Sequence, residues 1–450
     1  MKADSSATQA ETVSLLQSLI RFDTTNPPGN ELPLARHLDE LLRAEQIDTQ
    51  LLIPSENRGA VVARIRGDGS ARPVLLLAHM DVVGVEAEKW SCDPFGGLVR
   101  DGYLYGRGAI DDKGMLAANV MTMLLVQRRL VTTGEKLRRD VVFAATSDEE
   151  GGGAAGITWM VANHRELLDA EFAINEGGRT RIVAGGKRYL AIQTAEKISH
   201  MLTLTARGPA GHASIPLDGN AIFSLGRALE RLSRYSEPVI LTDTTRGFFR
   251  KLAAVWSDEG ERTAMSALAS SDPKEQARGA VVMSRIPVFN AVMRNTISPT
   301  IIAGGLQGNV IPAQVSAAVN VRTIPGSSID DVASRIKAAL GDDVEVSITA
   351  RGSEAPPSDG SSAMFEAIEA SAKELDPEMA VVPYLSTGST DSQALRRIGI
   401  NAYGILPFPM AKEDEERMHG HDERVPIESL HFGVRLIHES VTRVAERTET

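Results

Sequence analysis

Three adjacent acids, Asp148, Glu149 and Glu150, follow an apolar stretch that predicts a β-strand over residues 141–146. Carboxylates this close repel one another unless a cation lies nearby or water surrounds them. One carboxylate of such a group can bind a metal ion while its neighbour removes a proton from bound water. A solvated loop, or a helix start that favours acids, is the simpler alternative.

Two further apolar stretches end in residues of the same chemistry. His79 and Asp81 follow the stretch 74–78, and Glu176 follows the stretch 171–175. In an extended strand, His79 and Asp81 point to the same side, and ligands collect at the carboxyl ends of strands in α/β proteins. The three strand ends together predict one metal centre, although His79 alone could equally be a histidine hydrogen-bonded in a polar loop.

A glycine-rich segment precedes Asp111 and Asp112, and one of these two aspartates is expected to cap a helix that starts near Lys113. Near the C-terminus His419 and His421 compete as a further ligand, and their spacing alone does not choose between them. Three carboxylates and two histidines suit two divalent ions, with zinc favoured and cobalt or manganese as alternatives. The expected ligands are His79, Asp111, Glu150, Glu176 and His419.

Helix and strand patterns alternate in the first half of the chain and resume near the C-terminus, which predicts an α/β fold with a mostly parallel sheet covered on both faces. Strands are expected at 60–66, 74–78, 141–146, 171–175, 379–384 and 401–406, and helices at 113–130, 156–168 and 363–375. This catalytic domain is predicted to be discontinuous, comprising residues 1–193 and 353–450.

Between these parts, residues 194–352 are predicted to form a smaller inserted α+β domain, a lid or dimerisation domain. Helices are expected at 221–234 and 329–340. The stretch 242–288 is charged and rich in small residues, and it is expected to form extra helices or a mobile insertion.

Composition excludes several classes of protein. The formal net charge of −11 disfavours nucleic acid as a partner. The single cysteine, Cys92, cannot form an intramolecular disulfide and fits a reducing compartment. No apolar stretch is long enough to span a membrane, and the N-terminal residues lack the apolar segment of a signal peptide, so a cytoplasmic location is expected.

These motifs, in this order, resemble those of the zinc-dependent exopeptidase and deacylase family of glutamate carboxypeptidase, carboxypeptidase S, acetylornithine deacetylase and succinyl-diaminopimelate desuccinylase. The resemblance implies that His79 and His419 bind different metal ions, that Asp111 bridges them, and that Glu150 and Glu176 each complete one ligand set. It also implies a cis peptide bond between Asp111 and Asp112. Two further roles follow from it: Glu149 as general base and Asp81 as the partner that orients His79.

The same resemblance implies the parts that bind substrate. In the family a histidine in the position of His212 stabilises the oxyanion, supplied by the same chain or by the partner in a possible homodimer. Four residues resemble those that hold the free carboxylate of the substrate: Asn309, Arg322, Gly388 and Thr390. The implied reaction is hydrolysis of an amide bond next to a free carboxylate, in an N-acyl amino acid or a small peptide. Glu149 activates a metal-bridging water, and the choice between a deacylase and a dipeptidase or carboxypeptidase is open.

Two other functions compete with hydrolysis. Gly151, Gly153 and Gly156 spell a G-x-G-x-x-G motif after a strand, which is formally a dinucleotide fingerprint of an NAD-binding oxidoreductase. The acids at 148–150 oppose this interpretation because they would stand beside a pyrophosphate. A non-catalytic binding homologue is the other alternative, and it is disfavoured because every expected ligand type and Glu149 are present.

Overall fold

The computed structural model describes residues 5–446 and is built around a mixed nine-stranded sheet with the order β1-β2-β6-β3-β7-β17-β9-β16, in which β8 pairs with β9. Its centre is parallel: β3 lies between β6 and β7, and β17 runs parallel to β7. The strands are β1 (Asp48–Ser55), β2 (Arg58–Ile65), β3 (Val74–His79), β6 (Val141–Thr146), β7 (Phe172–Asn175), β8 (Arg179–Ile182), β9 (Arg188–Glu196), β16 (Ala380–Ser386) and β17 (Asn401–Gly404).

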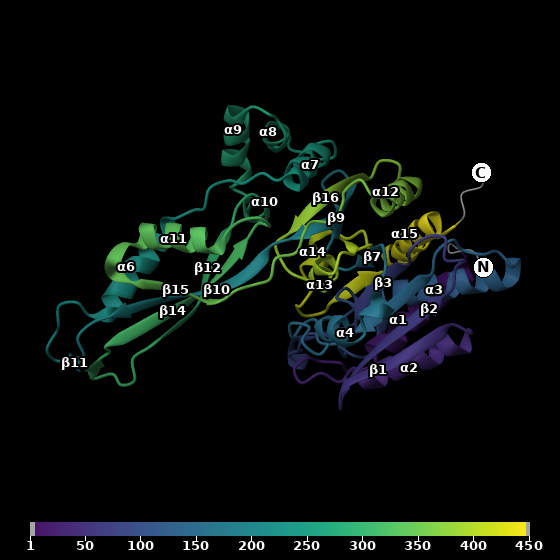
Figure 1. The fold of residues 1–450 in the computed structure, drawn as a ribbon, viewed down its shortest axis with the longest axis horizontal. Helices are drawn as coiled ribbons and strands as arrows, with labels where there is room; N and C mark the ends of the chain where they lie inside the picture. The colour runs from purple at the N-terminus through teal and green to yellow at the C-terminus, as the bar shows by residue number, and fades with distance from the viewer. Residues whose placement is uncertain (1–4, 447–450) are drawn as a thin grey trace.

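Helices cover both faces of this sheet (Figure 1). Every residue of β3 is buried, and alternate side chains serve the two faces: Leu76 packs into one apolar cluster and Leu77 into the other. One face is covered by α1 (Ser6–Ile20), α2 (Leu32–Ala44), α3 (Lys113–Thr133), α12 (Ala363–Leu375) and α15 (Ile427–Ala445). The other is covered by α4 (Ile157–Asn163), α5 (Arg165–Leu168) and α13 (Ser392–Arg397).

A second, four-stranded sheet has the order β12-β14-β10-β15 and is antiparallel throughout. It extends away from the nine-stranded sheet and ends in the short pair β11–β13 (Figure 1). Two amphipathic helices pack on it through residues such as Leu232 and Ile336. The elements are β10 (Ile198–Arg207), β11 (Gly211–His212), α6 (Ala221–Arg234), β12 (Thr296–Gly304), β13 (Val310–Ile311), β14 (Gln314–Thr323), α11 (Ile329–Leu340) and β15 (Glu345–Ala350).

Residues 242–288 form extra helices, one of the two outcomes expected for this stretch. They are α7 (Asp243–Leu252), α8 (Glu259–Leu268), α9 (Pro273–Met283) and α10 (Pro287–Val292). The helices α7, α8 and α9 each begin after a capping residue. The side chains of Thr242, Asp258 and Asp272 each accept a backbone N–H of the first turn. Phe248 and Phe249 of α7 pack with Tyr384 of β16 in a separate apolar cluster, so these helices lie against the nine-stranded sheet.

The remaining elements are short. A three-stranded sheet comprises β4 (Leu98–Arg100), β5 (Tyr103–Tyr105) and β18 (Arg424–Pro426), and the chain also forms α14 (Lys412–Glu415) and the 3-10 turns η1 (Ala87–Lys89) and η2 (Gly341–Asp343). The helix expected over 156–168 is interrupted, since His164 lies between α4 and α5. Among residues 5–446 no helix has both the length and the apolar character that crossing a bilayer requires.

Candidate metal centre

The sheet topology brings the chemically active segments together. Because β6, β3 and β7 are parallel neighbours, the residues that follow them meet at one edge of the sheet. His79 ends β3, Glu150 lies in the loop after β6, and Glu176 follows β7 directly. Asp111 comes from the loop before α3, so four segments distant in sequence contribute to this edge.

Asp111 lies between the two histidines. Its Oδ1 is 3.0 Å from Nε2 of His79, and its Oδ2 is 3.0 Å from Nε2 of His419. Nε2 of His419 also lies 3.0 Å from Oε1 of Glu150. One ligand atom each of His79, Asp111 and Glu150 fall within 4.8 Å of one another. His421 lies elsewhere, with Nε2 3.5 Å from a carboxylate oxygen of Glu86, so the structure places His419 and not His421 in this cluster.

The electrostatics of the cluster are those of crowded acids around two imidazoles. Burial raises the pKa of Glu176 well above its usual value, and the charges of Asp111 and Asp112 add to this effect. Burial also raises the pKa of Glu149, with Glu176 contributing. The neighbouring carboxylates of Asp111 and Glu150 raise the pKa of His419 to about 10.

The donor set fits divalent cations. Imidazole and carboxylate are the ligands that zinc and similar ions take. A cation would offset the repulsion that adds to burial in raising the pKa values of Glu149 and Glu176. Oε1 of Glu150 is buried and accepts no hydrogen bond from the described residues, although His419 is close. Such an unsatisfied carboxylate oxygen calls for a partner, and an ion would supply one.

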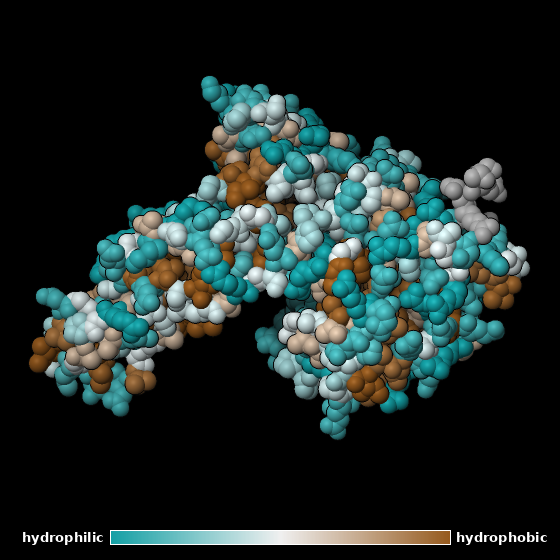
Figure 2. Space-filling view, viewed as in Figure 1, coloured by the Kyte–Doolittle hydropathy of each residue, from teal (hydrophilic) through white to brown (hydrophobic). Residues whose placement is uncertain are grey.

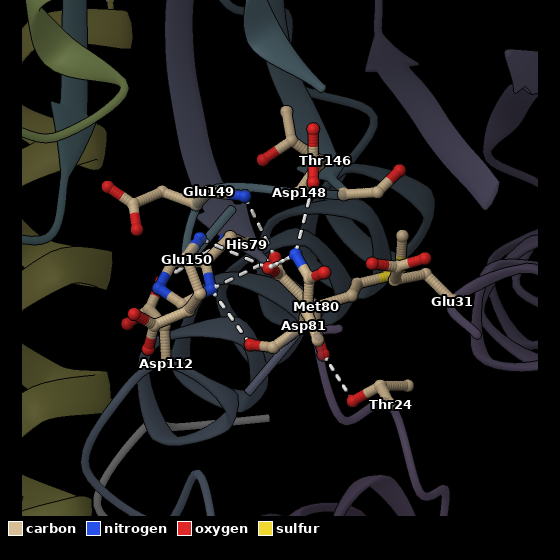
Figure 3. A network of polar contacts seen from close by, with 12 residues as sticks. Thr24, Glu31, His79, Met80, Asp81, Asp112, Thr146, Asp148, Glu149 and Glu150 are labelled. Atoms are coloured by element: carbon tan, nitrogen blue, oxygen red, sulfur yellow. Dashed lines mark hydrogen bonds and ion pairs between the residues drawn. The ribbon is translucent and has the colours of Figure 1, made fainter. Parts of the chain in front are cut away.

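Asp81 is fully buried and links the strand that carries His79 to the loop that carries the acids (Figure 3). Its two carboxylate oxygens accept the backbone N–H groups of Glu149 and Glu150, each at 3.1 Å, and Asn26 donates at 2.8 Å. Nδ1 of His79 lies 3.0 Å from the carbonyl oxygen of Asp81 and 3.5 Å from its Oδ1. The nearer contact of Asp81 with the imidazole is therefore made by its backbone carbonyl, and the carboxylate is more distant.

Asp111 and Asp112 are joined by a cis peptide bond, as the family resemblance implies. Asp112 occupies the N-cap position of α3, but its side chain does not cap the helix. Its Oδ2 instead accepts the N–H of His79 at 3.2 Å, so the capping expected from the sequence is wrong for this residue. The strand beside it engages this one oxygen, and Oδ1 is buried without a hydrogen-bond partner among the described residues.

His212, expected to stabilise the oxyanion, and Asn309, expected to bind the substrate, do not lie at the metal cluster of their own chain. Both are exposed at the far end of the four-stranded sheet, where β11 pairs with β13 (Figure 1). Nδ1 of His212 is 2.7 Å from the Ser214 hydroxyl, and the Asn309 carbonyl accepts the N–H of Ala213.

The other three residues, which were expected to bind substrate, lie together near the junction of the two sheets, where β9 leads into β10. Nη1 of Arg322 donates to the carbonyl of Thr387, the residue before Gly388. The backbone N–H and hydroxyl of Thr390 both donate to Glu196, at 2.7 and 2.8 Å. A Cβ on Gly177 would lie 3.0 Å from Cγ2 of Thr390, which places this loop beside Glu176 and thus beside the metal cluster.

The glycines of the possible dinucleotide motif are arranged differently from a phosphate-binding loop. Asp148 occupies the amide groups there: its carbonyl accepts the N–H of Gly153 and its Oδ2 accepts the N–H of Ala155. A Cβ on Gly156 would lie 1.7 Å from the carbonyl oxygen of Ser147, so this glycine permits close packing of the chain on itself. The loop therefore has a structural explanation that involves no ligand.

Three residues that sequence reasoning missed support the centre. Glu423 accepts the N–H groups of Gly108, Ile110 and Asp111 through its buried carboxylate and so fixes the loop that carries Asp111. Its place four residues after His419 was the available signal. Asn26 holds Asp81, and Asp391 accepts the hydroxyl of Thr146 at the end of β6; neither stands out in sequence.

Comparison with known proteins shows the family and the fold of the chain. The family model described as Peptidase family M20/M25/M40 matches residues 75–443. The human N-fatty-acyl-amino acid synthase/hydrolase PM20D1 is 29% identical over 383 residues, covering 83% of this chain and 74% of that protein. A probable carboxypeptidase S-like 2 of Dictyostelium discoideum is 30% identical over 371 residues, covering 80% and 70%. The M20 family metallo-carboxypeptidase Sso-CP2 of Sulfolobus solfataricus has the same fold, with a TM-score of 0.71, 20% identity, and coverage of 96% and 99%.

Proposed function

Because the chain belongs to peptidase family M20/M25/M40, it is a hydrolase, and we propose that its substrate is an N-acyl amino acid or small peptide with a free carboxylate next to the scissile amide. The observation that carries this proposal is the position of Asp111 between the imidazoles of His79 and His419. The names of the relatives, an N-fatty-acyl-amino acid hydrolase and a carboxypeptidase S-like protein, favour the same class of substrate. The family assignment does not favour the dinucleotide-binding and non-catalytic alternatives.

Two divalent ions, which we propose to be zinc, would be held by side chains of the cluster: His79, Asp111, Glu150, Glu176 and His419. When bound, such ions lower the pKa of water and polarise the scissile carbonyl. Cobalt and manganese take the same ligands, so the choice of zinc rests on its preference for mixed nitrogen and oxygen donors. Metal analysis of the purified protein would test both the number and the identity of the ions.

We assign the proton transfers to Glu149. Its backbone is fixed by Asp81, and Figure 3 shows its carboxylate pointing away from Asp148. Burial favours the protonated form of a carboxylate, so Glu149 can accept a proton from the attacking water and return it to the leaving amine. This places the acid and base steps on one side chain next to the ligands.

Arg322 and the loop around Gly388 are proposed to hold the free carboxylate of the substrate. The guanidinium is half-buried. Its Nη1 donates to the carbonyl of Thr387 at 3.3 Å and its Nε donates to Oδ1 of Asn320 at 3.2 Å, which leaves Nη2 to contact a carboxylate. Thr390 already donates twice to Glu196, so we expect it to shape the loop more than to bind the substrate.

We further propose that residues 194–352 act as a lid and dimerisation domain that supplies His212 and Asn309 to the partner's site. Both lie at the far end of the four-stranded sheet, away from their own metal cluster. Apolar side chains are exposed there on the edge strand β12 and beyond, including Ile301, Ile302 and the almost fully exposed Leu306 (Figure 2). A second copy of the chain would cover such a patch.

Subunit complementation tests this arrangement. Glu149→Ala and His212→Ala should each be inactive alone, but a mixture refolded or co-expressed together should regain about a quarter of the wild-type activity. In a mixed dimer, the chain that retains Glu149 would receive His212 from its partner. No regained activity, with both chains in one dimer, would place His212 outside the partner's site.

The primary test is Glu149→Ala beside an exposed control, Glu166→Ala. We expect the Glu149 variant to keep its metal content and to lose hydrolysis by about 10³-fold, because removal of a general base costs roughly 10²–10⁴-fold. The Glu166 variant should match the wild type in both measurements. Retained turnover in Glu149→Ala would refute the proposed role of Glu149. Hydrolysis assays with N-acyl amino acids and with dipeptides would distinguish a deacylase from a dipeptidase.

A cytoplasmic location stays a prediction that cell fractionation can test.

A further inference from the structure

A pocket of about 550 Å³ lies among the extra helices, and none of the expected site residues lines it. Its walls come from α7, from α9, and from the segments that precede α7 and follow α10. Pockets of roughly 300–1,000 Å³ hold drug-sized ligands, so this one, which we call the helix pocket, has room for a small organic molecule.

The charged side chains of the helix pocket have one sign. Arg246 and Arg294 line it, and none of the described residues that line it is acidic. The chain as a whole has 59 acidic residues and only 48 lysines and arginines, so the pocket departs from the character of the rest of the protein. Its two positive charges favour an anion as the ligand and disfavour a cation.

Arg294 is a half-buried cation that lacks a counter-ion among residues 5–446. Its Nη1 donates to the carbonyl of Glu237 at 2.9 Å, its Nη2 donates to the hydroxyl of Ser284 at 2.8 Å, and its Nε is buried without a partner. Burial lowers the pKa of this guanidinium, and no carboxylate acts to raise it again. Because Nη1 and Nη2 each carry a second N–H, the group can still donate to an anion that compensates its charge.

Arg246 contributes a guanidinium that is almost free to bind. Its ion-pair partner is Asp243, whose carboxylate oxygen lies 3.7 Å from Nε within the same turn of α7 and whose side chain is fully exposed. Exposed pairs of this kind contribute little stability, so Arg246 can exchange Asp243 for a bound anion with little loss. A guanidinium binds a carboxylate through two parallel hydrogen bonds when its donors are free.

The remaining walls of the helix pocket are mainly apolar. Val239 and Val281 are 37% and 64% exposed, and Leu241, Ala277 and Ala280 lie beside them in the lining. A ligand with an apolar body would remove these side chains from water. Two cations beside an apolar wall therefore match a molecule that has an anionic head and an apolar body.

We propose that the helix pocket binds a small organic carboxylate with an apolar body, at a site that shares no residue with the metal cluster. This inference goes beyond the proposed function and does not depend on it. The carboxylate would accept hydrogen bonds from Arg246 and Arg294, and the apolar body would lie against Val239, Leu241 and Val281. A carboxylate is favoured over a phosphate or phosphonate because a chain of net charge −11 repels a doubly charged ligand more strongly.

Calorimetric titration of the metal-loaded protein with phenylacetate tests the proposal. Arg246→Gln removes one of the two cations, and Ala277→Trp fills the pocket from an exposed position on α9. Arg250→Gln is the control for charge, since Arg250 is an exposed arginine of the same helix as Arg246 and lies outside the pocket. Val131→Trp, at a 68% exposed position of α3, is the control for the added indole ring.

The wild type and both controls should bind phenylacetate with the same affinity. Arg246→Gln and Ala277→Trp should each weaken this binding by about tenfold or more, because each removes either the charge or the space that the ligand needs. Phenethyl alcohol, which has the same ring and no charge, should bind the wild type at least as weakly as phenylacetate binds Arg246→Gln.

A carboxylate bound only at the metal ions would not respond to substitutions in the helix pocket. An affinity that is unchanged in both Arg246→Gln and Ala277→Trp would therefore overturn the inference, as would a wild type that does not bind phenylacetate. Equal affinities for phenylacetate and phenethyl alcohol would exclude the anionic head group. Tighter binding of benzylphosphonate than of phenylacetate would overturn the choice of a carboxylate.

Discussion

Replacement of Arg396 by methionine should destabilise the protein far more than an average substitution. Arg396 and Glu196 form an ion pair of 2.6 Å in which both side chains are 2% exposed. The guanidinium also donates to the carbonyls of Gln193 and Ala402. Glu196 in turn accepts both donors of Thr390, so the pair fixes the loop beside the metal centre.

Loss of one partner leaves the other charge buried without compensation, which costs about 3–5 kcal/mol. Glu196→Gln should cost less, about 1–3 kcal/mol, because the amide oxygen can still accept from Thr390 and Arg396 keeps its carbonyl partners. Arg396→Met with Glu196→Gln removes both charges, so the double variant should be more stable than the sum of the single effects predicts, by about 2 kcal/mol.

The pH dependence of the free energy of unfolding gives the sign of the electrostatic contribution of Glu196. Burial raises the pKa of Glu196 even though Arg396 lowers it, so removal of Arg396 should raise it further. A folded-state pKa above the unfolded value means that the folded protein binds more protons, and its stability then falls as pH rises. Arg396→Met should therefore lose more stability at pH 8 than at pH 5.

Urea unfolding followed by tryptophan fluorescence measures these values. A Trp256→Phe background leaves Trp90 and Trp159, both outside the extra helices, as reporters. A loss below about 1 kcal/mol in Arg396→Met, or strictly additive effects in the double variant, would refute the reasoning from burial. If Arg396→Met lost the same stability at pH 5 and at pH 8, the loss could not be assigned to the buried carboxylate of Glu196.

Three further substitutions have definite expected outcomes. Glu423→Ala frees the three amides that hold the loop of Asp111, so metal affinity should fall roughly 10–100-fold in a competition titration with a chelator. Burial lowers the pKa of Lys197 to about 7 from an unfolded value of 10.5. The free energy of unfolding of the wild type should therefore rise relative to that of Lys197→Met by about 3.5 kcal/mol between pH 7 and pH 10, as measured by unfolding at each pH. Gly156→Ala places a methyl group against the carbonyl of Ser147 and should lower the free energy of unfolding by about 3 kcal/mol, as measured by thermal unfolding. A loss below about 1 kcal/mol would show that the turn relaxes to accept the methyl group.

The sequence predicted which side chains meet in the cluster of His79, Asp111 and Glu150, because strand ends are local signals. The apolar strand 141–146 has the predicted bounds, and β3 extends only one residue beyond its prediction, to His79. Once these strands are parallel neighbours, their end residues must meet, and no knowledge of the rest of the chain is needed. The helices α6, α11 and α12 also have the predicted bounds, since their periodicity and caps are contained in the segment itself.

Features that depend on distant contacts could not be predicted in the same way. The position of His212 depends on how far the four-stranded sheet extends from the metal centre, and no local pattern specifies that length. The charged stretch 242–288 allowed either helices or a mobile insertion, because its apolar side chains become a core only against Tyr189 and Tyr384. The helix pocket is likewise invisible in the sequence.

The buried carboxylate of Asp81 has a consequence for mutagenesis. One side chain binds the amides of both Glu149 and Glu150, while its backbone carbonyl faces His79. Any replacement at position 81 would thus move the proposed proton acceptor and two proposed ligands at once. Kinetic data from such a variant would report a compound defect, and only changes made at the three neighbours separately can divide it into its parts.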